Sequence, residues 1–211
     1  MDGYLSPSFS HDKLDNPTFT DLVDVFEDLW RSYVFEPVKI LFEIPNGDVA
    51  GMTVLCSYFE AIESLTSGLS SKSKSQEFFT KGFSKVFSSP IGMNEVAKEV
   101  YIYIRCGLTH EGMLRSKVHY SRAGQKTFYL TYPKRPDGTL DTAAKCESII
   151  VNPIRMHEGT LKHFNNYVSE LRSGADQVQC DNFKMFITTQ LEVGGSESII
   201  GMTEAEFLGN E

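Results

Sequence analysis

The sequence predicts a mainly α protein of five or six helices with an inserted β-hairpin. Apolar residues recur at helical spacing through most of the 211-residue chain. Asn-Pro pairs and glycines stand where helices are expected to begin and end. Only one region, near residues 126–151, changes to β-favouring residues around a turn. We therefore expect a single domain over residues 1–193, followed by a flexible Gly/Ser/Glu-rich tail over 194–211.

The first predicted helix spans about residues 17–35. Asn16-Pro17 supplies a cap side chain followed by proline at the first helical position. Apolar residues then recur until Glu36-Pro37 interrupts the pattern. The short apolar run from Val38 to Ile44 is compatible with a continuation of this helix or with a separate turn.

The second predicted helix begins at Asp48, a candidate cap, and stops near Ser67-Gly68. Glu60 and Glu63 flank its apolar face. The Ser/Lys-rich segment 69–75 favours a flexible loop. A third helix with an aromatic face follows, marked by Phe78, Phe79, Phe83, Val86 and Phe87.

The fourth predicted helix is capped by Asn94 and leads directly to Arg105. The hairpin comes next, with strands near 126–132 and 146–151. Asn152-Pro153 repeats the cap-then-proline signal and predicts a fifth helix that ends at Ser173-Gly174. A sixth is expected around Phe183, Met185, Phe186 and Leu191.

Composition narrows the classes of protein that fit. The net charge of −8 argues against a protein that coats nucleic acid non-specifically. No apolar run is long enough to span a membrane, and the N-terminus lacks the order of a signal peptide, so we expect a cytoplasmic protein without a membrane partner. The cysteines form no CxxC, and we expect reduced core thiols, no metal and no cofactor. P-loop, GxSxG and HExxH motifs do not occur.

Positive charge is concentrated after residue 112. Between Gly112 and Pro136 there are six basic residues and no acid, whereas Met1 to Ala50 carries ten acids and three bases. Cations interleaved with aromatic residues can hold a phosphate backbone and stack on unpaired bases, although a polar hairpin has the same composition. The candidate RNA-binding residues are Arg115, Lys117, His119, Arg122 and Lys126, and the aromatic residues beside them are Tyr120, Phe128, Tyr129 and Tyr132.

Arg105 and His110 are the candidate catalytic residues. A cation that cannot deprotonate, beside a group that titrates near neutrality, can hold a phosphate and move a proton. On a regular α-helix five residues turn through 500°, which leaves the two side chains about 140° apart unless the helix distorts near Gly107. A structural interpretation is also open, in which Arg105 binds helix-end carbonyls and His110 caps the helix.

The apolar helix that ends in Arg105-Cys-Gly-Leu-Thr-His110-Glu-Gly, with the earlier segment Ser57-Tyr-Phe-Glu-Ala-Ile-Glu63, resembles the HEPN superfamily of small α-helical domains. The hallmark of that superfamily is an arginine followed four to six residues later by a histidine. The resemblance covers roughly 17–112 and 153–190 and leaves out the hairpin. It implies an antiparallel helical bundle that dimerises, so that two Arg/His pairs face one cleft.

The resemblance implies a metal-independent endoribonuclease. His110 and its copy in the second chain would move protons, while Arg105 would hold the phosphate and stabilise the transition state. The alternative is a non-catalytic RNA- or nucleotide-binding or protein-interaction module of the same fold. The partners to consider are a second copy of this chain, an RNA substrate and an antitoxin or other protein. Glu60 and Glu63 could orient Arg105, neutralise it, or simply face solvent.

Overall fold

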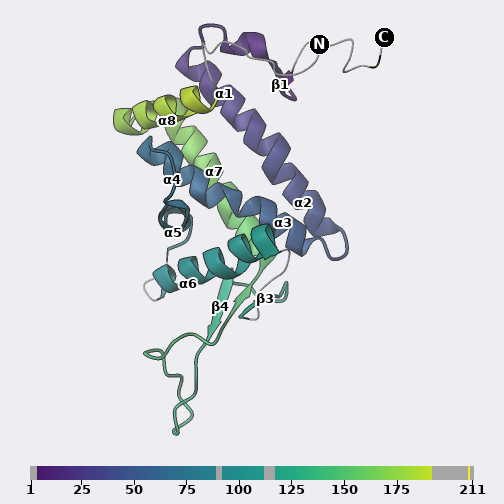
Figure 1. The fold of residues 1–211 in the computed structure, drawn as a ribbon, viewed down its shortest axis with the longest axis vertical. Helices are drawn as coiled ribbons and strands as arrows, with labels where there is room; N and C mark the ends of the chain where they lie inside the picture. The colour runs from purple at the N-terminus through teal and green to yellow at the C-terminus, as the bar shows by residue number, and fades with distance from the viewer. Residues whose placement is uncertain (1–3, 89–91, 112–116, 192–208, 210–211) are drawn as a thin grey trace.

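The computed structural model describes residues 4–88, 92–111, 117–191 and 209, without the side chains of Tyr4 and of 108–111. It is mainly helical, with a small sheet at one end from which a long loop projects (Figure 1). The helices are α1 (Phe19–Trp30), η2 (Arg31–Phe35), α2 (Glu36–Glu43), α3 (Asp48–Leu55), α4 (Ser57–Ser67), α5 (Ser75–Val86), α6 (Met93–Val100), η3 (Tyr101–Glu111), α7 (Pro153–Ser173) and α8 (Gln177–Gln190). The short N-terminal elements are β1 (Tyr4–Ser6), β2 (Phe9–Ser10) and the 3₁₀ turn η1 (His11–Leu14).

Helix α1 begins two residues later than the sequence predicted. Its cap is Thr18, whose side chain accepts a hydrogen bond from the Asp21 backbone, while the Asp21 carboxylate accepts one from the Thr18 backbone. This reciprocal capping box satisfies two N–H groups at once. Asn16 instead adopts a positive φ of 56° in the preceding turn. The prediction of an Asn16 cap was wrong because the stronger Thr-x-x-Asp signal follows two residues later.

The chain stays helical through Pro37. Residues 38–43 therefore continue the helix and do not form a separate turn. The segment η2 is a π-helix, in which the Glu36 N–H donates to the Arg31 carbonyl five residues earlier. Proline lacks an N–H and crowds the carbonyl four residues before it in a regular α-helix. A wider π turn directly before Pro37 accommodates both effects. Helix α2 follows and buries Val38 and Phe42.

The predicted second helix is present as α3 and α4, separated by a one-residue irregularity at Cys56. Asp48 is not its cap, because Gly47 occupies that position and no side chain bonds there. The predicted stop is confirmed: Gly68 adopts the left-handed conformation with φ of 70° and closes α4. The segment 69–74 then connects α4 to the aromatic-faced α5.

Aromatic side chains fill the core. Helix α7 lies against α1, α2, α3 and α5. Its Phe164 is buried among Phe26 of α1, Phe35 of η2 and Tyr58 of α4. The predicted boundaries of α7 are confirmed, since the Asn152 side chain caps it, Pro153 is its first residue and Gly174 ends it. The fully buried rings are Phe26, Phe35, Tyr58, Phe59, Phe79, Phe83, Phe164 and Phe183.

The sheet has three strands, in the order β3 (Val118–Tyr120), β5 (Ser148–Val151), β4 (Phe128–Thr131). Strands β4 and β5 are antiparallel and occupy the two predicted strand regions. Strand β3 is a correction to the predicted hairpin, because it pairs in parallel with β5. Three residues are too few to show a period of two, and a parallel partner must come from a distant part of the chain.

Candidate phosphodiester site

Arg105 lies in η3, which is a π-helix from Tyr101 to Glu111. Hydrogen bonds in a π-helix join residues five apart, and each turn takes up about 4.4 residues instead of the 3.6 of an α-helix. Five residues therefore turn through about 410°, which leaves backbone positions 105 and 110 about 50° apart around the axis of η3. The 140° separation expected on a regular α-helix does not apply here.

Glu60 and Tyr101 are among the residues that contact the guanidinium of Arg105. Its Nη2 atom lies 3.4 Å from Oε2 of Glu60 on α4. The group also lies over the ring of Tyr101, one turn earlier in η3, at 5.7 Å from the ring centre. The arginine and glutamate side chains are 27% and 21% exposed, so this ion pair is half-buried and is screened less than a surface pair.

Glu60 is itself positioned from α5. The hydroxyl of Ser75, the first residue of α5, donates to Oε2 of Glu60 over 2.7 Å. Glu63, the other acid that the sequence singled out, is buried and pairs with Lys85 at 2.6 Å instead. Only Glu60 of the two contacts Arg105, because residues three apart on an α-helix differ in direction by about 60° and here have different neighbours.

Arg105 borders a hollow of about 500 Å³ with a hydroxyl-rich wall. The wall includes Thr53, Ser57, Ser64 and Ser71, with Ala61 and Phe186 completing it. Thr53 and Ser64 donate to carbonyls of their own helices at 2.9 and 3.2 Å, and Ser57 donates to the Val54 carbonyl of α3 at 2.7 Å. Such oxygens keep acceptor capacity, which suits a ligand with hydroxyl groups such as ribose.

Cys56 lies in the same region and is buried. Burial raises the pKa of its thiol to about 12, and the positive charge of Arg105 acts in the opposite direction. The group is therefore a protonated thiol at neutral pH. A reactive thiolate is not part of this site.

Two of the predicted site residues, His110 and Arg115, lie partly or wholly outside the described part of the structure. The backbone of His110 belongs to η3, but its side chain lies outside the described part of the structure. Arg115 also lies outside the described residues.

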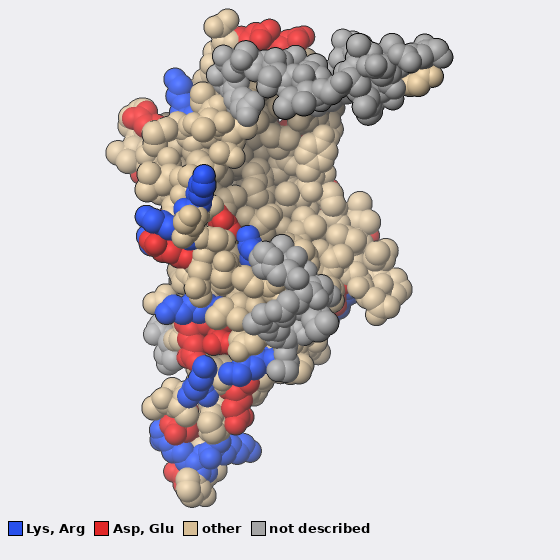
Figure 2. All heavy atoms as spheres, viewed as in Figure 1, with Lys and Arg blue, Asp and Glu red and all other residues tan. Residues whose placement is uncertain are grey.

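The remaining predicted RNA-binding residues belong to the sheet and its loops, not to the hollow beside Arg105. His119 is exposed on β3, and Lys126 is exposed between β3 and β4. Arg122 binds Asp48 at the start of α3, with Nη2 at 2.5 Å from Oδ1. That carboxylate balances the charge of Arg122. Figure 2 shows positive and negative side chains gathered over the sheet end of the molecule.

The four aromatic residues of the basic stretch separate into two groups. Phe128 packs edge-on against Phe87 and near Phe83, and Tyr120 is largely buried, which raises the pKa of its hydroxyl. Tyr132 is half-buried. Tyr129 alone among the four is exposed, at 62%. Packing of the helices against one sheet face explains this difference.

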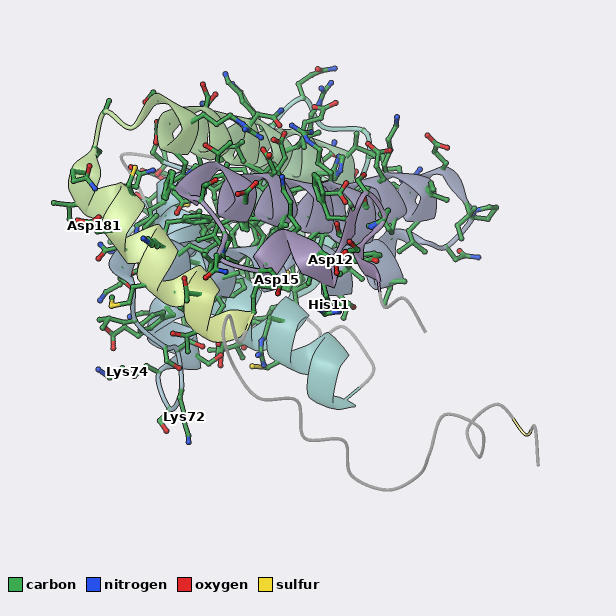
Figure 3. The ribbon with its side chains drawn as sticks, turned by 90° about the horizontal axis from the view of Figure 1, so that it is seen from above. His11, Asp12, Asp15, Lys72, Lys74 and Asp181 are labelled. Carbon is green, nitrogen blue, oxygen red and sulfur yellow. The ribbon has the colours of Figure 1, made fainter. Side chains whose placement is uncertain are left out.

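The segment between α4 and α5 was expected only as a flexible loop, yet it contributes to the site. Ser71 lines the hollow, and Ser75 holds Glu60. Lys72 and Lys74 are exposed and project away from the helices (Figure 3). In the sequence, only the serine and lysine content of this segment could have indicated a part in the site. The same content is typical of flexible linkers, so it did not distinguish the two.

Comparison with protein-family models, with curated proteins and with solved structures found no significant match. In the described part of the chain, His, Cys, Asp and Glu side chains form no group of three or more that could hold a metal ion. No helix among the described residues is both long and apolar enough to cross a bilayer.

Proposed function

We propose that this protein is a HEPN-like, metal-independent endoribonuclease that acts as a homodimer, with Arg105 and His110 at its site. The observation that carries the proposal is the π-helix η3, in which backbone positions 105 and 110 are about 50° apart instead of about 140°, with Arg105 beside a hollow that hydroxyl groups help to line. A π-helix is uncommon in proteins and occurs frequently at functional sites. The Arg-x4-His motif and its helical setting supply the family resemblance.

The chemistry is transesterification within the RNA strand. A base removes the proton of a ribose 2′-hydroxyl, and the oxygen attacks the adjacent phosphorus. The new O2′–P bond forms as the P–O5′ bond breaks, and an acid protonates the departing O5′. The products are a 2′,3′-cyclic phosphate and a 5′-hydroxyl. His110 of the two chains supplies the base and the acid in this proposal.

Arg105 stabilises the phosphate as negative charge builds up in the transition state. Glu60 holds the guanidinium over the hollow before substrate binds. The uncharged surface over the α1–α2 helix and α4, hollowed in Figure 2, supports a second copy of the chain on this side. A dimer there would bring two copies of η3 to one cleft.

A non-catalytic RNA- or nucleotide-binding module of the same fold is the second candidate. The observation that favours it is the ion pair with Glu60, because a carboxylate at 3.4 Å compensates the positive charge of Arg105. In that case Arg105 stabilises the contact between α4 and η3, and RNA or a protein partner binds elsewhere on the molecule.

Cleavage in the presence of EDTA separates the two candidates. We expect the full chain to cleave single-stranded RNA to a 2′,3′-cyclic phosphate, detected by mass spectrometry of the products. His110→Ala and Arg105→Ala should each lower the rate by at least about 100-fold, a typical cost of losing acid–base or electrostatic catalysis. Arg172→Ala serves as the matched control, since Arg172 pairs with Asp24 and Glu27 instead.

Intact RNA across several substrates, or cleavage that survives His110→Ala, contradicts the enzyme. The composite cleft has its own test, in which unchanged and His110→Ala subunits are co-expressed with different tags and the mixed dimer is purified. Because the proposed reaction uses both copies of His110, the mixed dimer should be about as inactive as the His110→Ala homodimer, whereas two independent sites would retain about half of the activity. A monomer in sedimentation experiments contradicts the shared cleft.

A further inference from the structure

We propose that the outer face of the β3–β5–β4 sheet binds unpaired RNA, with Tyr129 stacking on a base and Lys126 contacting the phosphate backbone. The choice of RNA as ligand rests on the proposed function. The surface is separate from the hollow beside Arg105, and the argument for it comes from the register of the sheet.

The register places one row of side chains on the outer face. His119 of β3 pairs with Ile150 of β5, and Ile150 pairs with Tyr129 of β4. The neighbouring rows contain Val118, Ile149 and Val151, which are buried against the helices. His119 and Tyr129 are exposed, and Ile150 is half-buried. Because strands lie about 4.8 Å apart, the row is about 10 Å long, enough for a short stretch of RNA to contact both ends.

A hollow of about 340 Å³ lies beside this row. Its lining includes Tyr129 and Ile150 of the sheet together with Ser121, Gln125 and Lys126 of the loop between β3 and β4. Of the described residues that line it, Lys126 carries a charge and none is a carboxylate. An anionic ligand with a flat apolar group fits this combination, because the cation attracts phosphate and the tyrosine ring offers a stacking surface.

Asn152 holds the loop that lines this hollow in place through hydrogen bonds. It is 4% exposed, and its Nδ2 atom donates to the carbonyls of Arg122 at 3.3 Å and Gly124 at 2.8 Å. Its Oδ1 atom accepts from the Arg155 backbone at the start of α7, and its own N–H donates to the Thr127 carbonyl. One buried side chain therefore ties the loop to both the sheet and α7. Such a loop can hold Lys126 beside Tyr129 with little loss of entropy on binding.

Unpaired RNA fits the surface better than a duplex. A tyrosine can stack only on a base whose face is accessible, and the bases of a duplex are covered by their neighbours. Fluorescence anisotropy with a labelled 12-nucleotide 2′-O-methyl RNA tests this directly. That probe has no free 2′-hydroxyl and cannot be cleaved by the proposed reaction, so binding is measured independently of activity.

We expect the single strand to bind more tightly than its duplex with a complementary strand. Tyr129→Ala should weaken single-strand binding by roughly tenfold, and Tyr129→Phe should retain it. Lys126→Ala should weaken binding and reduce its dependence on salt concentration. The controls are Tyr33→Ala, at an exposed tyrosine of η2, and Lys39→Ala, at an exposed lysine of α2.

Equal binding by Tyr129→Ala and the unchanged protein overturns the proposal, as does tighter binding of the duplex. A loss of self-association in Tyr129→Ala without a change in RNA affinity identifies the face as a protein contact and also overturns it. Arg105→Ala and His110→Ala test the proposed function. In either of these variants, adding Tyr129→Ala should still weaken binding of the probe. The two proposals therefore fail separately.

Discussion

At the scale of single residues, Glu60 is a side chain that contacts Arg105 and is itself held by a neighbouring helix. It accepts from Ser75 on α5 and from Arg105 on η3, so it joins three helices. An exposed ion pair contributes little to stability, and a half-buried one is retained more often for geometry than for energy. We infer that Glu60 is a positioning residue.

Glu60→Gln keeps the shape and a hydrogen-bond acceptor but removes the charge that holds the guanidinium. We expect kcat for RNA cleavage to fall by about tenfold, because one tenfold step corresponds to ~1.4 kcal/mol of lost transition-state stabilisation. The KM should fall or stay unchanged, since a negative charge beside the phosphate is removed. Steady-state kinetics on a short RNA measures both constants.

Glu77→Gln is the matched control, because Glu77 pairs with Lys81 on the exposed side of α5. Glu60→Asp, which keeps the charge, should recover part of the lost kcat. A parallel loss of thermal stability with no separation of kcat from KM indicates a purely structural role for Glu60.

At the scale of elements, the approach of α5 to α4 sets the position of Glu60. A Cβ added at Gly82 would lie 1.8 Å from the carbonyl oxygen of Phe59, the residue before Glu60. The absent side chain at position 82 lets the two helices pack backbone against backbone. The geometry of the site therefore depends on a glycine that does not contact it.

Gly82→Ala should lower the free energy of unfolding by roughly 1–3 kcal/mol, because the clash is with backbone and cannot be relieved by rotating a side chain. Urea denaturation measures the change. Gly124→Ala is the control, since a Cβ there meets nothing closer than 3.5 Å, and it should change stability by less than about 0.5 kcal/mol. Equal stability of the two variants contradicts the close packing of α4 and α5.

At the scale of the whole molecule, two histidines packed in the protein make its stability depend on pH. His157 is 8% exposed and its Nε2 lies 3.2 Å from the carbonyl of Phe35 in η2. His163 bonds to the hydroxyl of Tyr58 at 2.9 Å. Burial lowers the pKa of both imidazoles below the usual value near 6.5.

The neutral form is thus favoured in the folded protein, and the unfolded chain binds protons more readily. The stability from each histidine is fully present above the ordinary histidine pKa and is lost as pH falls through the lowered pKa of the folded state. We expect the free energy of unfolding to fall between pH 7.5 and 5.5, by at most about 1 kcal/mol per histidine. Urea midpoints at the two pH values measure this effect.

His157→Gln should reduce that pH dependence, whereas His119→Gln, at an exposed position of β3, should leave it as it is. An unchanged pH dependence in His157→Gln shows that the imidazole is not the group responsible. Protonation of paired carboxylates such as Glu27 and Asp28, whose pKa values are lowered, adds a further loss only at more acidic pH.

The sequence by itself determined the features that depend on residues close together in the chain, namely the positions and ends of helices. Periodic apolar residues located the helices, and Asn152-Pro153 and Gly174 located both ends of α7, because caps and left-handed residues act within a few positions of the chain. The same holds for Gly68 at the end of α4. The Arg-x4-His motif, on which the proposed function depends, was also visible without a structure.

Only the tertiary structure decided which residues meet. The π-helical form of η3, the choice of Glu60 over Glu63, the contribution of Ser71 and the parallel strand β3 all depend on contacts between distant segments. Exposure of Tyr129 and burial of Tyr120 likewise follow from which sheet face the helices cover. Local preferences amount to a few tenths of a kcal/mol per residue, and packing overrides them wherever burial of large side chains is involved.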